Sequence, residues 1–332
     1  MKVKKPQGKV TLNKKPQSFE FRKESFPIMY HTWVDQETGE EFTTIELDEL
    51  NQAQVHNQYR SKHSIPFIDE IKKIREQYGL SASKMSELLG LSANVYGNYE
   101  NGEMPSPATG KFIQLAKNPV EFNKLIELSK NVFDEREIAK IKLAVEKFTQ
   151  EDLLDLLIEE RLFGTKTPGN YNGYRVPTIE KIGAMAKYFA LKLEPFKTKM
   201  NKLLFYADFY HYSKTGYSIS GMTYRAITHG PVPLNYGGIY DRLADEGYVE
   251  VSEFEFEEYS GEKLVNHDGE PDMAIFSESE NQAIVKVEEK LGRLKTNDII
   301  NVSHEELAWQ KNIDDHGRIS YDYGFMLQHV DF

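Results

Sequence analysis

The sequence predicts a mostly helical α+β protein that contains more than one domain. Its 332 residues exceed the roughly 100–200 residues of a typical domain. Apolar residues recur at helical spacing through much of the chain, whereas short β-prone runs occur at residues 19–47 and again at 248–251. We therefore expect a small N-terminal β-hairpin unit, a helical middle domain and a mostly helical C-terminal domain with a few short strands.

The composition excludes several classes of protein. With no cysteine, the chain cannot form disulfides, thiolate zinc sites, iron–sulfur clusters or a Cys nucleophile. No stretch approaches about 18 uncharged apolar residues, and the basic N-terminus leads into no apolar segment. This predicts a cytoplasmic chain without a membrane span or a signal peptide.

The net charge of -11 is unevenly distributed. Residues 1–25 hold eight Lys and Arg against two Glu, whereas residues 245–290 hold fifteen Asp and Glu against three Lys. The first block could meet nucleic acid and the second would be repelled by it, but solvated surface and a flexible tail are the simpler explanation of both blocks.

The N-terminal region is expected to have two parts. Residues 1–18 are rich in lysine and proline and lack apolar periodicity, which predicts a disordered basic arm. Short β-prone runs follow between Phe19 and Leu47, with Gly39 in a turn where a positive φ is expected. We assign residues 19–60 to a small β unit.

Two short helices are predicted within residues 79–102, GLSASKMSELLGLSANVYGNYENG. A tight turn at Gly90 joins them, and Ser92 is expected to cap the second. This spacing predicts a helix-turn-helix, whose second helix can enter a DNA major groove about 12 Å wide. A preceding helix at 66–78 and later helices from Ser106 and over 119–163 complete a domain at 61–163.

The run Tyr99-Glu100-Asn101-Gly102 resembles the end of the XRE/Cro-like repressor helix-turn-helix, and residues 60–130 resemble the C-terminal domain of MqsA-type antitoxins. The resemblance implies binding to operator DNA. Two positions at which that family commonly offers Gln and Arg hold Ala82 and Ala93. The DNA-binding candidates that remain are Ser81, Ser83, Lys84, Ser92, Asn94, Tyr96 and Asn98.

The alternative for this domain is a helix-turn-helix fold that serves only in dimerisation or as a scaffold. The unit at 19–60 stands where MqsA-type proteins carry a zinc-binding CxxC pair. Because the chain has no cysteine, we expect a degenerate, zinc-free version of that unit.

A linker is predicted at residues 164–174, GTKTPGNYNGY, because Gly, Asn, Thr and Pro dominate there. Beyond it we expect a C-terminal domain at 175–332. Its expected helices lie at 178–192, 198–213, about 238–246, 278–294 and after Ser303, where Ser303 and Glu306 form the pattern of a capping box.

Four features of the C-terminal domain resemble the Panacea domain of SocA-like antitoxins. They are Lys202-Leu203-Leu204-x-Tyr206, Tyr224-Arg225-Ala226, Gly230-Pro231-Val232 and the Ser303-His304 to Trp309 segment. The resemblance implies an antitoxin of a type II toxin–antitoxin system, which neutralises a protein toxin by contact and represses its own operon, with a homodimer as the expected DNA-binding form. Since Tyr, Trp and Arg dominate interface hot spots, the toxin-binding candidates are Tyr224, Arg225, His229, Tyr236 and Trp309.

Enzymatic motifs are lacking. His304-Glu305 begins like HExxH, but the second His position holds Ala308, and neither a Walker A motif nor a GxSxG motif occurs. We therefore predict no catalytic residue, no metal, no cofactor and no membrane partner. Three alternatives stay open: a transcription factor whose C-terminal half senses a ligand or dimerises, an adaptor that delivers a partner to a protease, and an enzyme with an unrecognised site.

Overall fold

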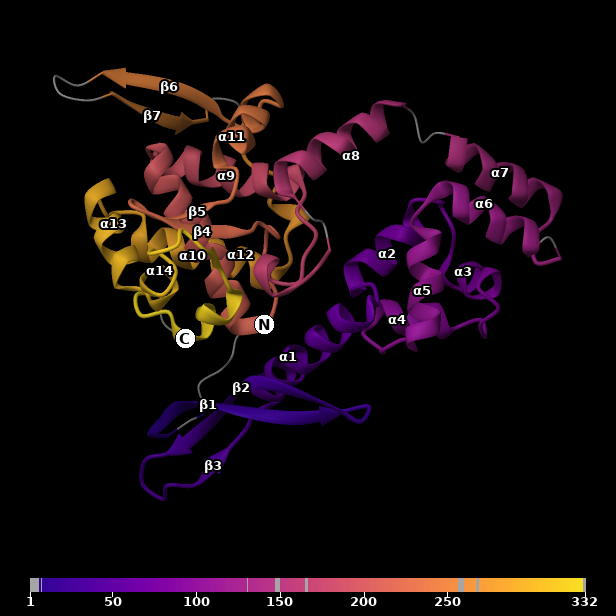
Figure 1. Cartoon of the computed structure of the whole chain (residues 1–332), viewed down its shortest axis with the longest axis horizontal. Helices are drawn as coiled ribbons and strands as arrows, with labels where there is room; N and C mark the ends of the chain where they lie inside the picture. Colours follow the sequence, from indigo (N-terminus) through magenta and orange to yellow (C-terminus); the bar gives the residue numbers. More distant parts are fainter. Residues whose placement is uncertain are drawn as a thin grey trace. The chain divides into compact units, whose positions relative to one another are not determined.

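The computed structural model describes residues 6, 8–129, 131–146, 150–164, 167–255, 260–266 and 269–330. It divides into two compact units. One comprises residues 1–55 and 159–332, and the other comprises residues 56–158 (Figure 1). None of the helices in the described part of the chain is both long and apolar enough to cross a membrane.

A three-stranded antiparallel sheet opens the chain, with β1 (Val10–Phe21), β2 (Glu24–Asp35) and β3 (Glu41–Phe42) in sequence order. The turn between β1 and β2 consists of Arg22 and Lys23, both at positive φ. The prediction of a disordered arm over 1–18 is therefore wrong from Val10 onward. Pro16 is tolerated in β1 because β1 is an edge strand.

Helix α1 (Ile45–His63) was not predicted, since residues 19–60 were assigned to a β unit. Its amide side chains bind the backbone of β2 as a neighbouring strand would. Asn51 exchanges two hydrogen bonds with His31 N and O (2.9 and 3.0 Å), and Gln54 does the same with Met29 (2.9 and 2.9 Å). These bonds satisfy the open edge of β2 at Met29 and His31, and β3 pairs with the same edge at Trp33 and Val34.

The second unit is helical. Its elements are the end of α1, α2 (Ile68–Glu76), α3 (Ala82–Leu88), α4 (Val95–Glu100), α5 (Pro107–Ala116), α6 (Pro119–Leu128), α7 (Glu135–Glu146) and the start of α8 (Gln150–Phe163). The apolar faces of α2 to α7 meet in one core, in which the rings of Tyr78 and Phe122 stack at 3.5 Å. The predicted cap of α5 is confirmed, since Ser106 accepts a hydrogen bond from Thr109 N–H.

The C-terminal part of the first unit is α+β. Its helices are α9 (Ile179–Leu193), α10 (Lys197–Thr215), α11 (Tyr236–Asp245), α12 (Glu278–Leu291), α13 (Thr296–Glu305) and α14 (Leu307–Gln310). Its strands are β4 (Tyr224–Ile227), β5 (Gly230–Pro233), β6 (Glu250–Glu255), β7 (Ser260–Val265) and β8 (Arg318–Ile319). Short 3-10 helices span Asn170–Asn172, Met273–Ile275 and Tyr321–Met326.

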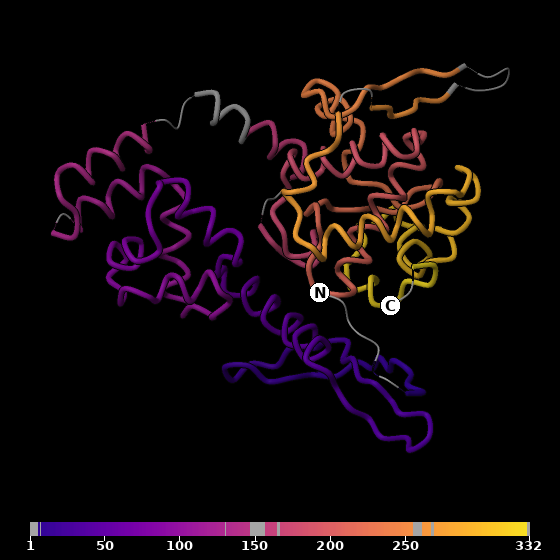
Figure 2. Tube along the Cα trace, turned by 180° about the vertical axis from the view of Figure 1, so that it is seen from behind, coloured from indigo at the N-terminus to yellow at the C-terminus, as the bar shows by residue number. Residues whose placement is uncertain are grey.

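Helix α10 is the centre of this part. Most of its residues are buried, and it contacts α9, α12, α13, β5 and β7. The sheet of order β5-β4-β8 lies against it, and the β6–β7 hairpin, whose strand β7 contacts α9 and α10, projects from one side of this part (Figures 1 and 2). A helix covered on several sides needs apolar and aromatic residues around its circumference, as the sequence LLFYADFYHY provides.

The predicted linker at 164–174 is wrong for its second half. Asn170 donates hydrogen bonds to Ser320 and Asp322, and Ser218 Oγ donates to Asn172 O at 2.8 Å. Gly173, at φ 58°, packs so closely on Ser218 that a Cβ would lie 2.8 Å from Ser218 N. These residues belong to the folded C-terminal part.

Candidate functional site

The helix-turn-helix is formed by α3, the turn at Gly90 and α4. Ser81 caps α3 by accepting the Lys84 N–H, and Gly90 has a φ of 69°. Helix α4 begins at Val95 with Asn94 at the N-cap position, so the prediction that Ser92 caps it is wrong. Ser86 Oγ accepts the Tyr96 N–H at 2.9 Å and ties the two helices together.

The Tyr99-Glu100-Asn101-Gly102 run has a structural role in this unit. Glu100 binds the Arg75 guanidinium with both carboxylate oxygens, at 2.6 and 3.2 Å, which fixes α4 against α2. Gly102 follows at a φ of 105°, a conformation that favours glycine and ends the helix.

The structure separates the predicted DNA-binding residues into three groups. Ser81, Ser92, Asn94 and Asn98 are exposed, and Ser83 is half-buried. Lys84 is engaged by Glu137 and Glu87, at 3.3 and 3.7 Å. Tyr96 is fully buried and donates its hydroxyl to Ile71 O at 2.8 Å, so its prediction as a DNA contact is wrong. The Tyr96 ring belongs to the core because it shares a helix face with Tyr99.

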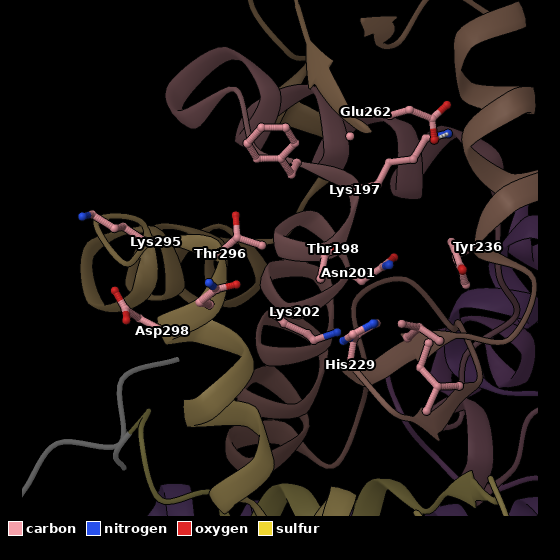
Figure 3. Close-up of a pocket in the computed structure, with 15 residues that line it drawn as sticks. Lys197, Thr198, Asn201, Lys202, His229, Tyr236, Glu262, Lys295, Thr296 and Asp298 are labelled. Carbon is pink, nitrogen blue, oxygen red and sulfur yellow. Dashed lines mark ion pairs between the residues drawn. The ribbon is translucent and has the colours of Figure 1, made fainter. Parts of the chain in front are cut away.

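A second candidate site is a pocket of about 790 Å³ in the C-terminal part (Figure 3). Helix α10, the β4–β5 turn, β7 and the N-terminus of α13 supply its walls. The lining residues are Phe196, Lys197, Thr198, Asn201, Lys202, Ile227, His229, Val232, Tyr236, Gly261, Glu262, Lys295, Thr296, Asn297 and Asp298.

Lys202 lies deepest in the wall that α10 contributes. Its side chain is 0% exposed, and Nζ has no hydrogen-bond partner in the described part of the chain. Burial lowers the pKa of this lysine from 10.5 to about 7. Figure 3 shows the amine extending from α10 towards His229.

Gly230 explains how the backbone approaches this lysine so closely. A Cβ at Gly230 would lie 2.6 Å from Lys202 Cε and would collide with Ser303 Oγ, and its φ is 94°. Both the space and the backbone conformation therefore require glycine at the start of β5. The Gly230-Pro231-Val232 sequence thus forms the cover over Lys202.

The Ser303-His304 to Trp309 segment makes contacts within the C-terminal part of the fold. The rings of His304 and Trp309 stack at 3.9 Å, and Trp309 Nε1 donates to Ile227 O at 2.8 Å. Ser303 lies inside α13 and donates to Ile300 O, and Glu306 accepts the Gln328 N–H, so the predicted Ser303–Glu306 capping box is wrong.

The predicted toxin-binding residues differ in how exposed they are. Tyr224 is fully buried and donates to Asp208 Oδ2 at 2.7 Å, so its assignment to a partner surface is wrong. His229 is exposed, whereas Arg225, Tyr236 and Trp309 are half-buried. His229 and Tyr236 line the pocket and share its rim (Figure 3). The burial of Tyr224 had a signal in the sequence, because Tyr224 and Ala226 flank the charged Arg225 as two residues on one face of a strand do.

Asp208 on α10 is the hub of a buried polar network. Its carboxylate accepts hydrogen bonds from Ile219 N–H and Ser220 N–H, both at 2.8 Å, and from the hydroxyls of Ser220 and Tyr224. Sequence reasoning missed this residue because its acceptor role depends on groups that the fold brings to it. Among the described residues, no group of three or more His, Asp or Glu side chains is arranged to bind a metal ion.

The fold and the sites define a two-part protein, a helix-turn-helix module combined with an α+β domain that carries a polar pocket. Residues 200–310 match the family model of the antitoxin SocA-like Panacea domain, and residues 71–117 match a helix-turn-helix family. The chain therefore carries a Panacea domain and a helix-turn-helix domain, as their sequence signatures indicated.

No curated protein and no solved structure matches the chain. The resemblance of residues 19–60 to the zinc-binding unit of MqsA-type antitoxins lies outside both family matches and stays a prediction.

Proposed function

We propose that this protein is an antitoxin of a type II toxin–antitoxin system, which binds a cognate protein toxin through its Panacea domain and represses its own operon through the helix-turn-helix. The observation that supports this proposal is the presence of both domains in one chain. Occlusion of the toxin needs a folded surface of standard interface size, about 1,200–2,000 Å² in total, and no catalysis.

Growth of cells that express the neighbouring gene, alone and together with this protein, tests the proposal. We expect toxicity from the neighbour alone, rescue on co-expression, and a stable complex of the full-length proteins. Rescue with accelerated loss of the partner would indicate a proteolytic adaptor, and a harmless neighbour would contradict the antitoxin function.

The partner surface is proposed to include His229 and Tyr236, at the rim of the pocket. Replacing both by Ala removes an aromatic anchor and a polar group from the centre of the contact, so we expect toxin affinity to fall at least about tenfold. Isothermal titration of the full-length variant with the toxin measures this. Lys290→Ala, at an exposed position on α12, is the control. Unchanged affinity in the double variant would place the toxin elsewhere.

The DNA surface is proposed to include Asn94 and Asn98, which are exposed on and before α4. Asparagine can form a bidentate contact with adenine, worth about 1–3 kcal/mol of discrimination. We therefore expect Asn98→Ala to weaken operator binding about tenfold while leaving binding to random DNA unchanged.

Fluorescence anisotropy at a fixed salt concentration of about 150 mM measures both affinities. Asn131→Ala, an exposed Asn between α6 and α7, is the matched control. Equal affinity of the wild-type protein for its own promoter and for random DNA would contradict sequence-specific repression and favour the scaffold alternative.

A second candidate function is a transcriptional regulator whose C-terminal half senses a ligand. The pocket favours it, because its volume of about 790 Å³ is that of small-molecule sites. This candidate predicts operator affinity that changes with a small molecule in the absence of any toxin.

A further inference from the structure

Helix α10 has two buried lysines, Lys199 and Lys202, that differ in whether the amine has a hydrogen-bond acceptor. Lys199 Nζ donates to the carbonyls of Gly292 and Leu294, both at 2.7 Å, and so serves the end of α12. Lys202 Nζ, one turn further along, is more deeply buried and has no acceptor among the residues that the structure describes. Burying an ammonium group without an acceptor lowers the stability of the fold. An unpaired buried lysine therefore indicates that its acceptor is supplied by a bound ligand.

The pocket beside Lys202 offers further donors. Thr198 and Asn201 lie on the same helix and line the same wall. Asn201 Oδ1 accepts the Tyr240 hydroxyl at 2.7 Å, which leaves the amide nitrogen of Asn201 as a donor. The first turn of α13 also faces the pocket, and its N-cap residue, Lys295, makes no side-chain capping bond (Figure 3). Backbone N–H groups at such a helix end attract anions.

Among the charged residues that line the pocket, Lys202 is the buried cation without a partner in the described part of the chain. Lys197 is paired with Glu262 at 2.8 Å, and Lys295 and Asp298 are exposed. His304 of α13 interacts electrostatically with Lys202 and with His229 of the β4–β5 turn. No carboxylate therefore neutralises the amine from within the described part of the pocket wall.

The remaining lining is apolar or aromatic. Phe196, Ile227, Val232 and Tyr236 form walls suited to a flat or apolar body, and the volume of about 790 Å³ admits a small organic molecule.

We propose that this pocket binds a small organic anion, a phosphate or carboxylate on an aromatic or apolar body, with the Lys202 ammonium as the cation that holds its oxygens. Thr198, Asn201 and the first turn of α13 donate to the same oxyanion, and the rings at the rim hold the body. This site shares Tyr236 with the proposed partner surface, but its test uses no toxin, so either assignment can fail alone.

Calorimetric titration of the full-length protein with phenyl phosphate and with benzoate tests the site, and benzyl alcohol serves as the neutral probe. We expect one anion per chain, no binding of the alcohol, and a loss of at least about tenfold in Lys202→Met. Lys290→Met, an exposed lysine of α12, should bind as the wild type does. The two anions distinguish phosphate from carboxylate. Binding of neither anion, or equal binding by Lys202→Met, overturns the proposal.

A measurement on the unaltered protein tests the same assignment without a variant. Without a ligand, the Lys202 amine has a pKa of about 7, and an anion binds only its protonated form. Benzoate stays ionised near neutral pH, so its affinity should fall by up to about tenfold per pH unit above pH 7, with proton uptake on binding. An affinity that is independent of pH between about 7 and 8.5 contradicts the role of Lys202.

Discussion

Lys202→Met is expected to raise the free energy of unfolding of the C-terminal part by about 4 kcal/mol near pH 7. The lysine is fully buried without a hydrogen-bond partner in the described residues, and burial lowers its pKa from 10.5 to about 7. Methionine has a similar length, fills the same space and carries no charge to desolvate. The wild-type chain thus bears an energetic cost that the variant avoids.

The pH dependence of this difference follows from the direction of the pKa shift. Between about pH 7 and pH 10.5 the unfolded chain binds the lysine proton and the folded chain does not. Raising the pH through this window therefore stabilises the wild-type protein relative to the variant. The gap should be constant below about pH 7 and should shrink steadily up to pH 10.5.

Chemical denaturation followed by tryptophan fluorescence measures both effects. Both tryptophans, Trp33 and Trp309, belong to the unit that contains α10, so their signal reports that unit and not the helix-turn-helix unit. A variant that is no more stable than the wild type, or a gap that does not change with pH, would contradict the assignment of Lys202 as a buried, unpaired amine.

Asp208→Ala is expected to lower the free energy of unfolding by about 3–5 kcal/mol. The carboxylate accepts two backbone N–H groups and two hydroxyls in the interior, and all four donors would lose their acceptor. The loop over Ile219 and Ser220 would lose its anchor to α10, and Tyr224 would lose its hydroxyl contact.

The same fluorescence measurement applies, with Asp241→Ala as the control. Asp241 is exposed on α11, and its replacement should change stability by less than about 0.5 kcal/mol. Equal stability of the two variants would show that the Asp208 network contributes little to the fold.

The helix-turn-helix could be predicted because its information is local. The turn positions of Gly90 and Gly102, the serine cap at Ser106 and the apolar spacing between them follow from backbone conformation and helical periodicity. Helix α10 was recognised from its motif for the same reason, since the motif lies in one short stretch of sequence.

The N-terminal sheet was predicted in part. The lysines and Pro16 of β1 have low β propensity, but an edge strand tolerates them because one side of its backbone needs no partner. The turn at Arg22 and Lys23 contains no glycine, although both residues adopt positive φ, so it lacked the usual sequence signal. Helix α1 has polar residues on the face that binds β2, which obscured its amphipathic pattern.

The sequence by itself determined the mostly helical α+β class, the helix-turn-helix and the Panacea signature, because helix periodicity, caps and turn glycines act over a few residues. Only the tertiary structure decided which residues of those motifs are available to a ligand. Tyr96 and Tyr224 are core residues, His229 is exposed, and Lys202 is buried in a pocket wall. Burial depends on elements distant in sequence, such as α13 and the cover at Gly230, so no local pattern can specify it.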